Sequence, residues 1–209
     1  MTRKFSRSSA KSDQQKKKGQ TTAGMIRIIA GKWRGRRLPV HDIEGLRPTT
    51  DRVKETVFNW LMNDIDQTRC LDCFAGSGSL GFEVLSRGAA SVTMIEKDHQ
   101  AAKQLAENVT LLAPGNTDDI KAQIVKTDCL SYLSTQTIPY DLVFIDPPFR
   151  QNLAEPVCEL LESRGLLTPS ALIYVEVESE LTDLAVPANW QLLKEKTAGQ
   201  VSFRLYQNG

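Results

Sequence analysis

The sequence predicts a three-layer α/β fold in which helices cover both faces of a mostly parallel β-sheet. From residue 69 onward, short apolar runs alternate with amphipathic stretches, which is the pattern of parallel strands joined by crossover helices. A glycine-rich segment follows the first of these runs, and Asp-Pro-Pro-Phe ends the fourth run abruptly. Both features put polar chemistry at the carboxyl ends of strands, where ligands of such folds bind.

Composition and charge narrow the class of protein. The 209 residues are 41% hydrophobic, enough for one domain with a core, and no apolar run approaches the roughly 20 residues that span a bilayer. The net charge of +1 hides a division, because residues 1–37 carry +11 and residues 38–209 carry −10. A basic arm on an acidic body is typical of a protein with a polyanionic partner, most often nucleic acid.

The four cysteines favour a reducing compartment. Cys70 and Cys73 form a C-x-x-C pair, but residues three apart on a strand point to opposite faces. No second pair completes a zinc site. We therefore expect structural thiols, no bound metal and a cytoplasmic protein.

The amino-terminal part predicts two segments with different roles. Residues 1–24 contain almost no apolar side chains and are expected to form a disordered basic tail. In residues 25–48, apolar runs at 26–30 and 36–40 flank Gly31 and predict a hairpin followed by a connector. Cations around an aromatic ring suit phosphates and unpaired bases, although a solvated edge hairpin would look similar. The residues expected to bind nucleic acid are Arg27, Lys32, Trp33, Arg34, Arg36, Arg37 and, in the next helix, Arg52.

Residues 49–209 predict a single α/β domain. A helix at 50–63 keeps Val53, Val57, Trp60 and Leu61 on one face. Strands are then expected at 69–74, 91–96, 121–126, 140–145 and 171–177, and helices at 79–87, 98–112, 129–134 and 152–163. Two last runs near 190–197 and 200–207, joined by Ala198-Gly199, predict a hairpin that adds one antiparallel strand near the C-terminus.

The glycine-rich segment predicts a cofactor loop. Gly76, Gly78 and Gly81 satisfy G-x-G-x-x-G between a predicted strand and a predicted helix, the context that allows a nucleotide-like ligand to approach the backbone closely. Glu96 ends the second strand, where an acid can accept hydrogen bonds from both ribose hydroxyls. Asp128 ends the third strand and could reach an adenine edge or cap the following helix.

Asp72 favours S-adenosylmethionine over NAD as this cofactor. Its carboxylate stands just before the glycines, where it would repel a pyrophosphate and could hold an α-ammonium group, unless it is only a loop cap. An NAD-dependent oxidoreductase is further disfavoured because neither His41 nor His99 occupies a catalytic position.

The run Asp146-Pro147-Pro148-Phe149 predicts the catalytic turn. Two prolines stiffen the backbone and fix the directions of its carbonyls. An acceptor at Asp146 and a flat ring at Phe149 together suit a planar group that carries an NH₂. Asp146 would orient the amino group rather than act as a strong base, since an unperturbed carboxylate has a pKa near 3.9. The alternative is a loop in which Asp146 caps a helix and Phe149 fills the core.

Several segments together resemble a known family. They are IIAGKWRGRRL (28–38), LRPTTDRVKETVFNWL (46–61), LDCFAGSGSLGFEVLSRGA (71–89), IEKD (95–98) and FIDPPF (144–149). With them the chain is similar to class I Rossmann-like S-adenosylmethionine methyltransferases, and more narrowly it resembles the bacterial 16S ribosomal RNA (guanine-N2) methyltransferase D family.

The resemblance implies an activity and a set of site residues. The activity is methylation of the exocyclic N2 amino group of one guanine in 16S ribosomal RNA, in an assembled or partly assembled small subunit, by a monomer. The implied base contacts are Asp146, Pro147, Pro148 and Phe149. The implied cofactor contacts are Asp72, Ala75, Gly76, Gly78, Glu96 and Asp128, with Arg47 and Thr49 beside the methionine end.

Two other functions stay open from the sequence. An adenine-N6 nucleic-acid methyltransferase would use the same turn chemistry. A non-catalytic RNA-binding ribosome assembly factor would be expected to have a broken cofactor loop or to lack Asp146, and neither departure is present.

Overall fold

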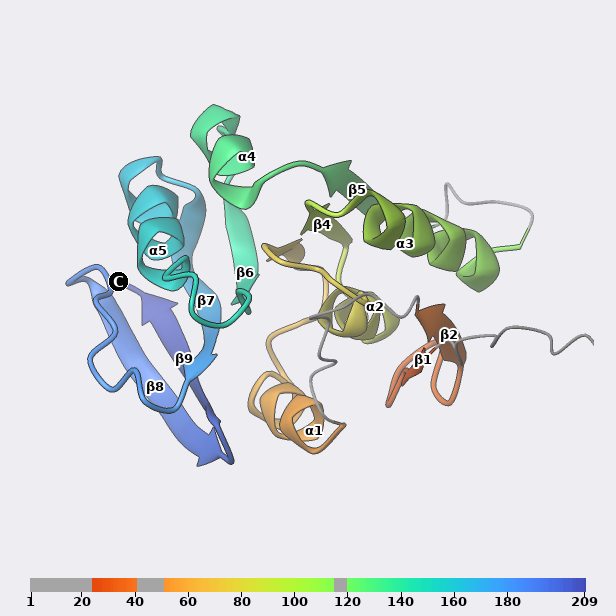
Figure 1. Ribbon diagram of the computed structural model, residues 1–209, viewed down its shortest axis with the longest axis horizontal. Coiled ribbons are helices and arrows are strands. Elements are labelled where there is room, and N and C mark those ends of the chain that lie inside the picture. The colour runs from red at the N-terminus through yellow and green to blue at the C-terminus, as the bar shows by residue number, and fades with distance from the viewer. Residues whose placement is uncertain (1–23, 41–50, 115–119) are drawn as a thin grey trace, which may run out of the picture.

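The computed structural model describes residues 24–40, 51–114 and 120–209. The predicted alternation of strands and helices is present throughout them (Figure 1). The strands are β1 Gly24–Arg27, β2 Arg37–Val40, β3 Arg69–Asp72, β4 Ser91–Glu96, β5 Ala122–Lys126, β6 Tyr140–Ile145, β7 Leu167–Glu178, β8 Trp190–Ala198 and β9 Val201–Asn208. The helices are α1 Asp51–Trp60, α2 Ser79–Ser86, α3 His99–Leu112, α4 Cys129–Thr135 and α5 Ala154–Ser163.

Seven strands form the central sheet in the order β5-β4-β3-β6-β7-β9-β8. Strands β3 to β7 pair in parallel, whereas β9 pairs antiparallel with both of its neighbours. The prediction of one antiparallel strand near the C-terminus is therefore confirmed. Strands β1 and β2 form a separate antiparallel sheet, which confirms the predicted hairpin.

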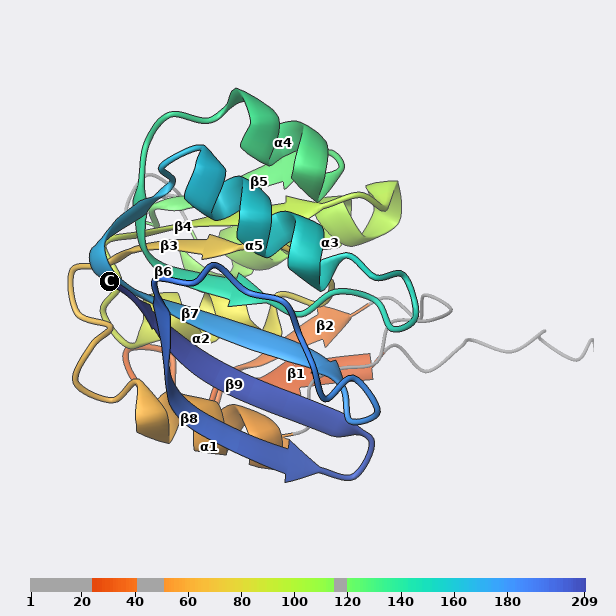
Figure 2. The same cartoon turned by 90° about the vertical axis from the view of Figure 1, so that its left-hand side faces the viewer.

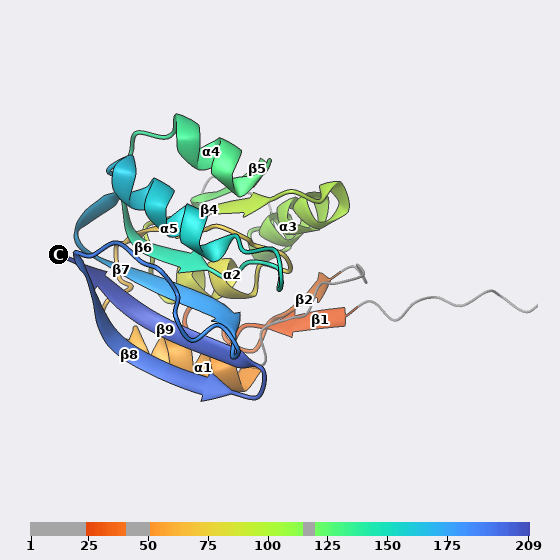
Figure 3. The ribbon, with the colours of Figure 1, turned by 60° about the vertical axis from the view of Figure 1, so that its left-hand side comes forward.

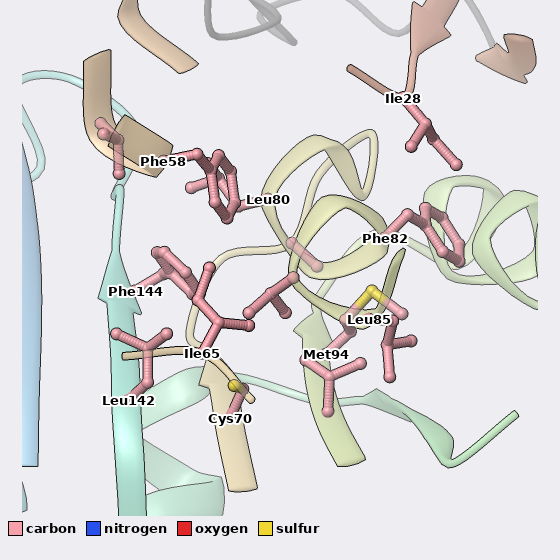
Figure 4. Packing of buried hydrophobic residues seen from close by; sticks show 14 of the residues in the cluster. Ile28, Phe58, Ile65, Cys70, Leu80, Phe82, Leu85, Met94, Leu142 and Phe144 are labelled. Carbon is pink, nitrogen blue, oxygen red and sulfur yellow. The ribbon is translucent and has the colours of Figure 1, made fainter. Parts of the chain in front are cut away.

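Helices cover both faces of the sheet and define two hydrophobic cores (Figure 2). Apolar side chains of α1, α2 and α3 pack on one face together with Cys70, Leu142 and Phe144. Figure 4 shows the part of this core that α1 and α2 contribute. Helices α4 and α5 pack on the other face around Val143 and Ile145. Cys70 and Cys73 fall in different cores, so the C-x-x-C pair is split between the two faces as predicted.

Two strand boundaries differ from the prediction by three residues or more. The first hairpin strand ends at Arg27 rather than at residue 30, because the chain then opens into a wide loop closed by two hydrogen bonds between Ile28 and residues 35 and 36. Gly31 has a φ of 80° and lies against α2, where a Cβ would overlap the carbonyl of Ser86. Strand β7 begins at Leu167, four residues earlier than predicted, because Leu167 pairs with Tyr140 ahead of an irregularity, after which regular pairing with β6 starts at Leu172.

The hairpin is part of the main body. Ile26, Ile28 and Leu38 belong to the same core cluster as α2 and α3. In Figure 3 the hairpin lies on the side toward which β6 and β7 point, the side on which the predicted cofactor loop and catalytic turn follow their strands. No helix in the described part of the chain is long and apolar enough to cross a membrane.

Candidate active site

The loop between β3 and α2 has the geometry of a cofactor cradle. Gly76 and Gly78 have φ values of 51° and 79°, which residues with side chains rarely adopt. A Cβ on Gly78 would overlap the ring of Phe82, and one on Gly81 would overlap the side chain of Met94. Glycine is thus required for the turn at the first two positions and for close packing of α2 at the third.

Asp72 lies beneath this loop. It is only 2% exposed, and its Oδ2 accepts a hydrogen bond from the amide of Gly81 at 3.1 Å. Burial is the main reason that the pKa of this carboxyl is raised to about 7, against the opposing effect of the backbone amides of Gly81 and Phe74. The side chain therefore orders the first turn of α2 and can place a negative charge under the loop.

Glu96 and Asp128 lie at the ends of the next two strands. Glu96 accepts hydrogen bonds from Gly76 N at 2.8 Å and Asp98 N at 2.7 Å, so its carboxylate is already held against the glycine loop. Asp128 caps α4, because its Oδ1 accepts from Ser131 N at 3.1 Å. The helix-cap alternative for Asp128 is correct, and this role is compatible with a further contact through its other oxygen.

The predicted catalytic turn follows β6, directly beside the cofactor loop. Strands β3 and β6 are neighbours, and Asp72 pairs with Phe144. Two residues after Phe144, Asp146 opens the turn, in which Pro147 is buried and the ring of Phe149 is 36% exposed. An exposed ring does not fit the alternative in which Phe149 fills the core.

The chain after the turn is held in an unusual backbone conformation. Arg150 and Asn152 have φ values of 62° and 52°, although neither is glycine, and such strain requires support from neighbouring groups. The support comes from the end of β7, where the carboxylate of Glu178 accepts a hydrogen bond from the amide of Arg150.

The hairpin differs from expectation at Trp33. This side chain is only 8% exposed and packs in the core beside α2 and α3, so it is not a surface platform for bases, and the prediction of a stacking role was wrong. The backbone amide of Trp33 donates a hydrogen bond to Ser86 Oγ at 3.0 Å. This bond holds the residue against α2, and its ring is buried there. The other predicted contacts remain on the surface: Arg27, Lys32, Arg34, Arg36, Arg37 and Arg52 are all exposed.

Three residues that the sequence reading missed hold this hairpin in place. Glu83 is fully buried, accepts hydrogen bonds from Ile29 N at 2.7 Å and Ala30 N at 3.0 Å, and pairs with the guanidinium of Arg87. Ser86 Oγ donates to the carbonyl of Ala30. The ammonium of Lys54, which is also buried, donates to the carbonyl of Arg27 at 2.6 Å. A single acid inside the apolar helix LGFEVL was the available signal for Glu83.

Arg47 and Thr49 lie outside the described residues. A cavity of about 680 Å³ opens at the amino ends of the strands, beside Arg69, Ser91 and Tyr140. It lies across the sheet from Gly76 and Asp146, so it is a different feature from the candidate active site.

Comparison with known proteins gives consistent matches over nearly the whole chain. The family model described as conserved hypothetical protein 95 matches residues 26–207. The ribosomal RNA small subunit methyltransferase D of Escherichia coli K12 is 53% identical over 192 residues, which are 92% of this chain and 94% of that protein. The protein of the same name from Haemophilus influenzae is 55% identical over 187 residues, 88% of this chain and 95% of that protein. The solved structure of Escherichia coli yhhF superposes with a TM-score of 0.79 at 53% identity, over 88% of this chain and 98% of that one.

Proposed function

The chain belongs to the family described as conserved hypothetical protein 95, and from this premise we propose that it methylates the N2 amino group of a guanine in 16S ribosomal RNA, with S-adenosylmethionine as the methyl donor. Relatives more than 50% identical over about nine tenths of the chain are named ribosomal RNA small subunit methyltransferase D. The observation that carries the proposal is the adjacency of two loops. The glycine loop after β3 and the Asp146 turn after β6 follow neighbouring strands of one sheet.

The loop after β3 fits S-adenosylmethionine. This cofactor supplies a methyl group that its sulfonium already activates. Gly76, Gly78 and Ala75 would let the backbone approach the ligand, and Glu96, next to Gly76, would accept the ribose hydroxyls. Asp128 would contact the adenine. Asp72, with its raised pKa, would gain from a neighbouring ammonium group, whereas a pyrophosphate in the same place would be repelled.

The turn after β6 fits a planar base with an amino group. Asp146 and the carbonyl of Pro147 would accept N–H hydrogen bonds and so align the amino nitrogen with the methyl group. A guanine amino nitrogen becomes positive as the bond to carbon forms, and the carboxylate of Asp146 would stabilise that charge. The exposed ring of Phe149 would stack on a base that has left its helix or loop, with Pro148 keeping the turn rigid.

The hairpin fits the phosphates of the same substrate. Arg27, Lys32, Arg34, Arg36 and Arg37 are exposed cations of one hairpin. Strands β1 and β2 lie on the side toward which the parallel strands point (Figure 3). The loop between them lies against the C-terminal ends of α2 and α3, where Lys32 N donates to Ser86 O and Arg36 donates to Leu112 O. Residues 25–48 would thus serve as the RNA-binding part, with Arg52 at its border, and 49–209 as the methyltransferase part. Since ribosomal RNA is the substrate, the protein would act in the cytoplasm.

The test is transfer of labelled methyl from S-adenosylmethionine, followed by nucleoside analysis of the product. Small subunits from a strain that lacks this protein are compared with naked 16S ribosomal RNA and with duplex DNA. N2-methylguanosine in an RNA sample supports the proposal, and the preferred sample shows how far the subunit must be assembled. Methylated adenine would instead favour an adenine-N6 enzyme. Tight RNA binding without any incorporation would favour a non-catalytic assembly factor. Light scattering of the free and RNA-bound protein tests the expected monomer.

A further inference from the structure

The carboxyl end of β7 carries a buried acid that the mechanism above does not use. Glu176 is 5% exposed, and the neighbouring Tyr174 is fully buried. The phenol of Tyr174 donates a hydrogen bond to Oε2 of Glu176 at 2.6 Å. Aromatic rings of Phe144 and Phe203 pack around Tyr174, with centroids 6.1 and 6.4 Å away, so the phenol is held firmly and fixes one oxygen of the carboxylate.

Glu176 stands next to Asp146. Strands β6 and β7 pair in parallel with Phe144 opposite Tyr174 and Ile145 opposite Val175. One residue further, the same register places Asp146 beside Glu176, about 5 Å away between neighbouring strands. Side chains two residues apart on a strand share a face, so Asp146 and Glu176 lie on the same face as Phe144 and Tyr174. The pKa of the Tyr174 phenol is raised mainly by burial, and the charges of Glu176 and Asp146 add to this shift.

One oxygen of Glu176 remains open. Within residues 24–40, 51–114 and 120–209, its carboxylate receives a hydrogen bond from Tyr174 at Oε2 and forms no ion pair. Every buried side-chain nitrogen and oxygen in that part of the chain has a hydrogen-bond partner. Oε1 of Glu176 must therefore keep contact with solvent. Asp146 follows the neighbouring strand β6 at the same edge of the sheet.

A buried carboxylate with a single neutral donor is unfavourable on its own. Burial raises the pKa of Glu176, and the Tyr174 hydrogen bond opposes that shift only in part. A further N–H donor at Oε1 would stabilise the ionised form. A purely structural acid would be expected to have both oxygens satisfied by the protein, so the open oxygen points to a ligand.

We propose that Glu176 is a specificity-determining residue that accepts the ring N1–H of the target guanine while Asp146 accepts a hydrogen bond from its amino group. The inference rests on the proposed function. Guanine presents these two donors side by side on its Watson–Crick edge, whereas adenine presents an amino group beside a ring nitrogen that is an acceptor. Two carboxylates on neighbouring strands therefore attract guanine and repel adenine. The hydrogen bond at N1 also pushes electron density toward the amino nitrogen, which is otherwise a poor nucleophile.

The test replaces the target guanine with 2-aminopurine, which keeps the amino group at C2 but has an acceptor in place of N1–H. The methylated guanine is first located by the nucleoside assay, and 2-aminopurine is then placed there in ligated RNA. Wild-type protein should prefer guanine by about 10- to 100-fold in kcat/KM, the range expected for reading one base edge. In Glu176→Gln the Tyr174 phenol should hold the amide oxygen, which turns the amide NH₂ toward the base. The preference should then fall about 100-fold or reverse in favour of 2-aminopurine.

Two matched variants separate base reading from a structural role. Glu178→Gln changes an acid two residues further along β7, keeps an oxygen for the amide of Arg150, and should leave the preference unchanged. Tyr174→Phe keeps the ring but frees the carboxylate, and should lower the guanine preference severalfold with little change in melting temperature. If Glu176→Gln does not fold, the guanine preference of Tyr174→Phe tests the proposal by itself.

The outcomes distinguish the two proposals. If wild-type protein methylates neither base, the proposed function fails. If wild-type protein methylates guanine and a folded Glu176→Gln keeps the same preference, or binds cofactor but methylates neither base, then Glu176 does not read the base. An unchanged preference in Tyr174→Phe, where that variant alone folds, overturns the inference as well.

Discussion

The hairpin and the catalytic turn would both touch RNA, yet the protein holds them by different means. The hairpin has only four paired residues in each strand. Three buried polar side chains of α1 and α2 form hydrogen bonds with its backbone: Lys54, Glu83 and Ser86. The catalytic turn instead continues directly from the buried strand β6, and Glu178 supports only its far end. Loss of a polar side chain should therefore lower the stability of the protein at the hairpin, whereas at the turn it should lower activity alone.

The strongest test of this comparison is Glu83→Ala. The change removes the acceptor for two backbone amides and for Arg87, all inside the protein. Breaking such a buried pair from one side lowers the free energy of unfolding by about 3 to 5 kcal/mol, which urea unfolding measures. Glu107 on α3 provides the control, because its i,i+4 pair with Lys103 is exposed and its replacement by alanine should change stability by less than about 0.5 kcal/mol. Equal small losses would mean that apolar packing alone holds the hairpin.

At the turn, Asp146→Ala should show the opposite balance. Turnover should fall about 100- to 1000-fold, as for the loss of one transition-state hydrogen-bond partner. Stability and cofactor affinity should change little, because strand β6, which precedes the turn, is held by its pairing with β3 and β7. Labelled-methyl transfer, urea unfolding and calorimetry with S-adenosylmethionine measure the three quantities. Asp183→Ala, an exposed aspartate on the loop after β7, should affect none of them. Unchanged turnover in Asp146→Ala would contradict the catalytic assignment.

The same contrast explains what the sequence could and could not predict. The sheet, its helices and the catalytic turn follow from local patterns, such as the apolar run before Asp146 and the glycines at 76, 78 and 81. These patterns depend on neighbours in the chain. Boundaries shifted where a distant contact decides them, as at Arg27, where the approach of Gly31 to α2 ends the strand.

The burial of Trp33 could not be predicted for a related reason. A tryptophan among arginines looks like an exposed ring, and only the docking of its amide on Ser86, 53 residues away, shows otherwise. Glu83 and Glu176 were missed because each stands in an otherwise apolar run, next to valine on both sides at Glu176 and between phenylalanine and valine at Glu83. Their partners, Ile29 and Ala30 for the first and the neighbourhood of Asp146 for the second, are adjacent only in the folded sheet.

An effect of intermediate size is expected at Asp72, which should make both stability and cofactor affinity depend on pH. Burial raises the pKa of this carboxyl from its ordinary 3.8 to about 7, so between about pH 4 and pH 7 the folded state keeps a proton that the unfolded state has released. Stability of the free protein through this group should then fall as pH rises across that window, by at most about 1.4 kcal/mol per pH unit. An ammonium group nearby favours the ionised form, so affinity for S-adenosylmethionine should rise from pH 6 to pH 8.

Asp72→Asn separates this group from others nearby. The variant keeps an oxygen for the amide of Gly81 but cannot ionise, so both slopes should flatten. Urea unfolding at pH 5 and pH 8, and calorimetric titration with the cofactor at pH 6 and pH 8, measure them. Slopes equal to those of the wild-type protein would mean that ionisation of Asp72 does not cause the pH dependence.

The smallest expected effect concerns the exposed arginines on the outer surface of the hairpin. It tests whether this surface binds phosphates, separately from the buried side chains that hold the hairpin in place. Arg34 and Arg37 are exposed, whereas Arg36 also donates to the carbonyl of Leu112 and would perturb packing if it were changed. Arg34→Gln and Arg37→Gln should each reduce the slope of log affinity for RNA against log salt by about 0.7 to 0.9, one phosphate contact each. Stability and cofactor binding should not change. Lys196→Gln on the edge strand β8, also exposed, is the matched loss of one charge and should leave the slope as it is. Equal slopes in all three variants would mean that the buried anchors hold a hairpin whose role is structural rather than a surface for phosphates.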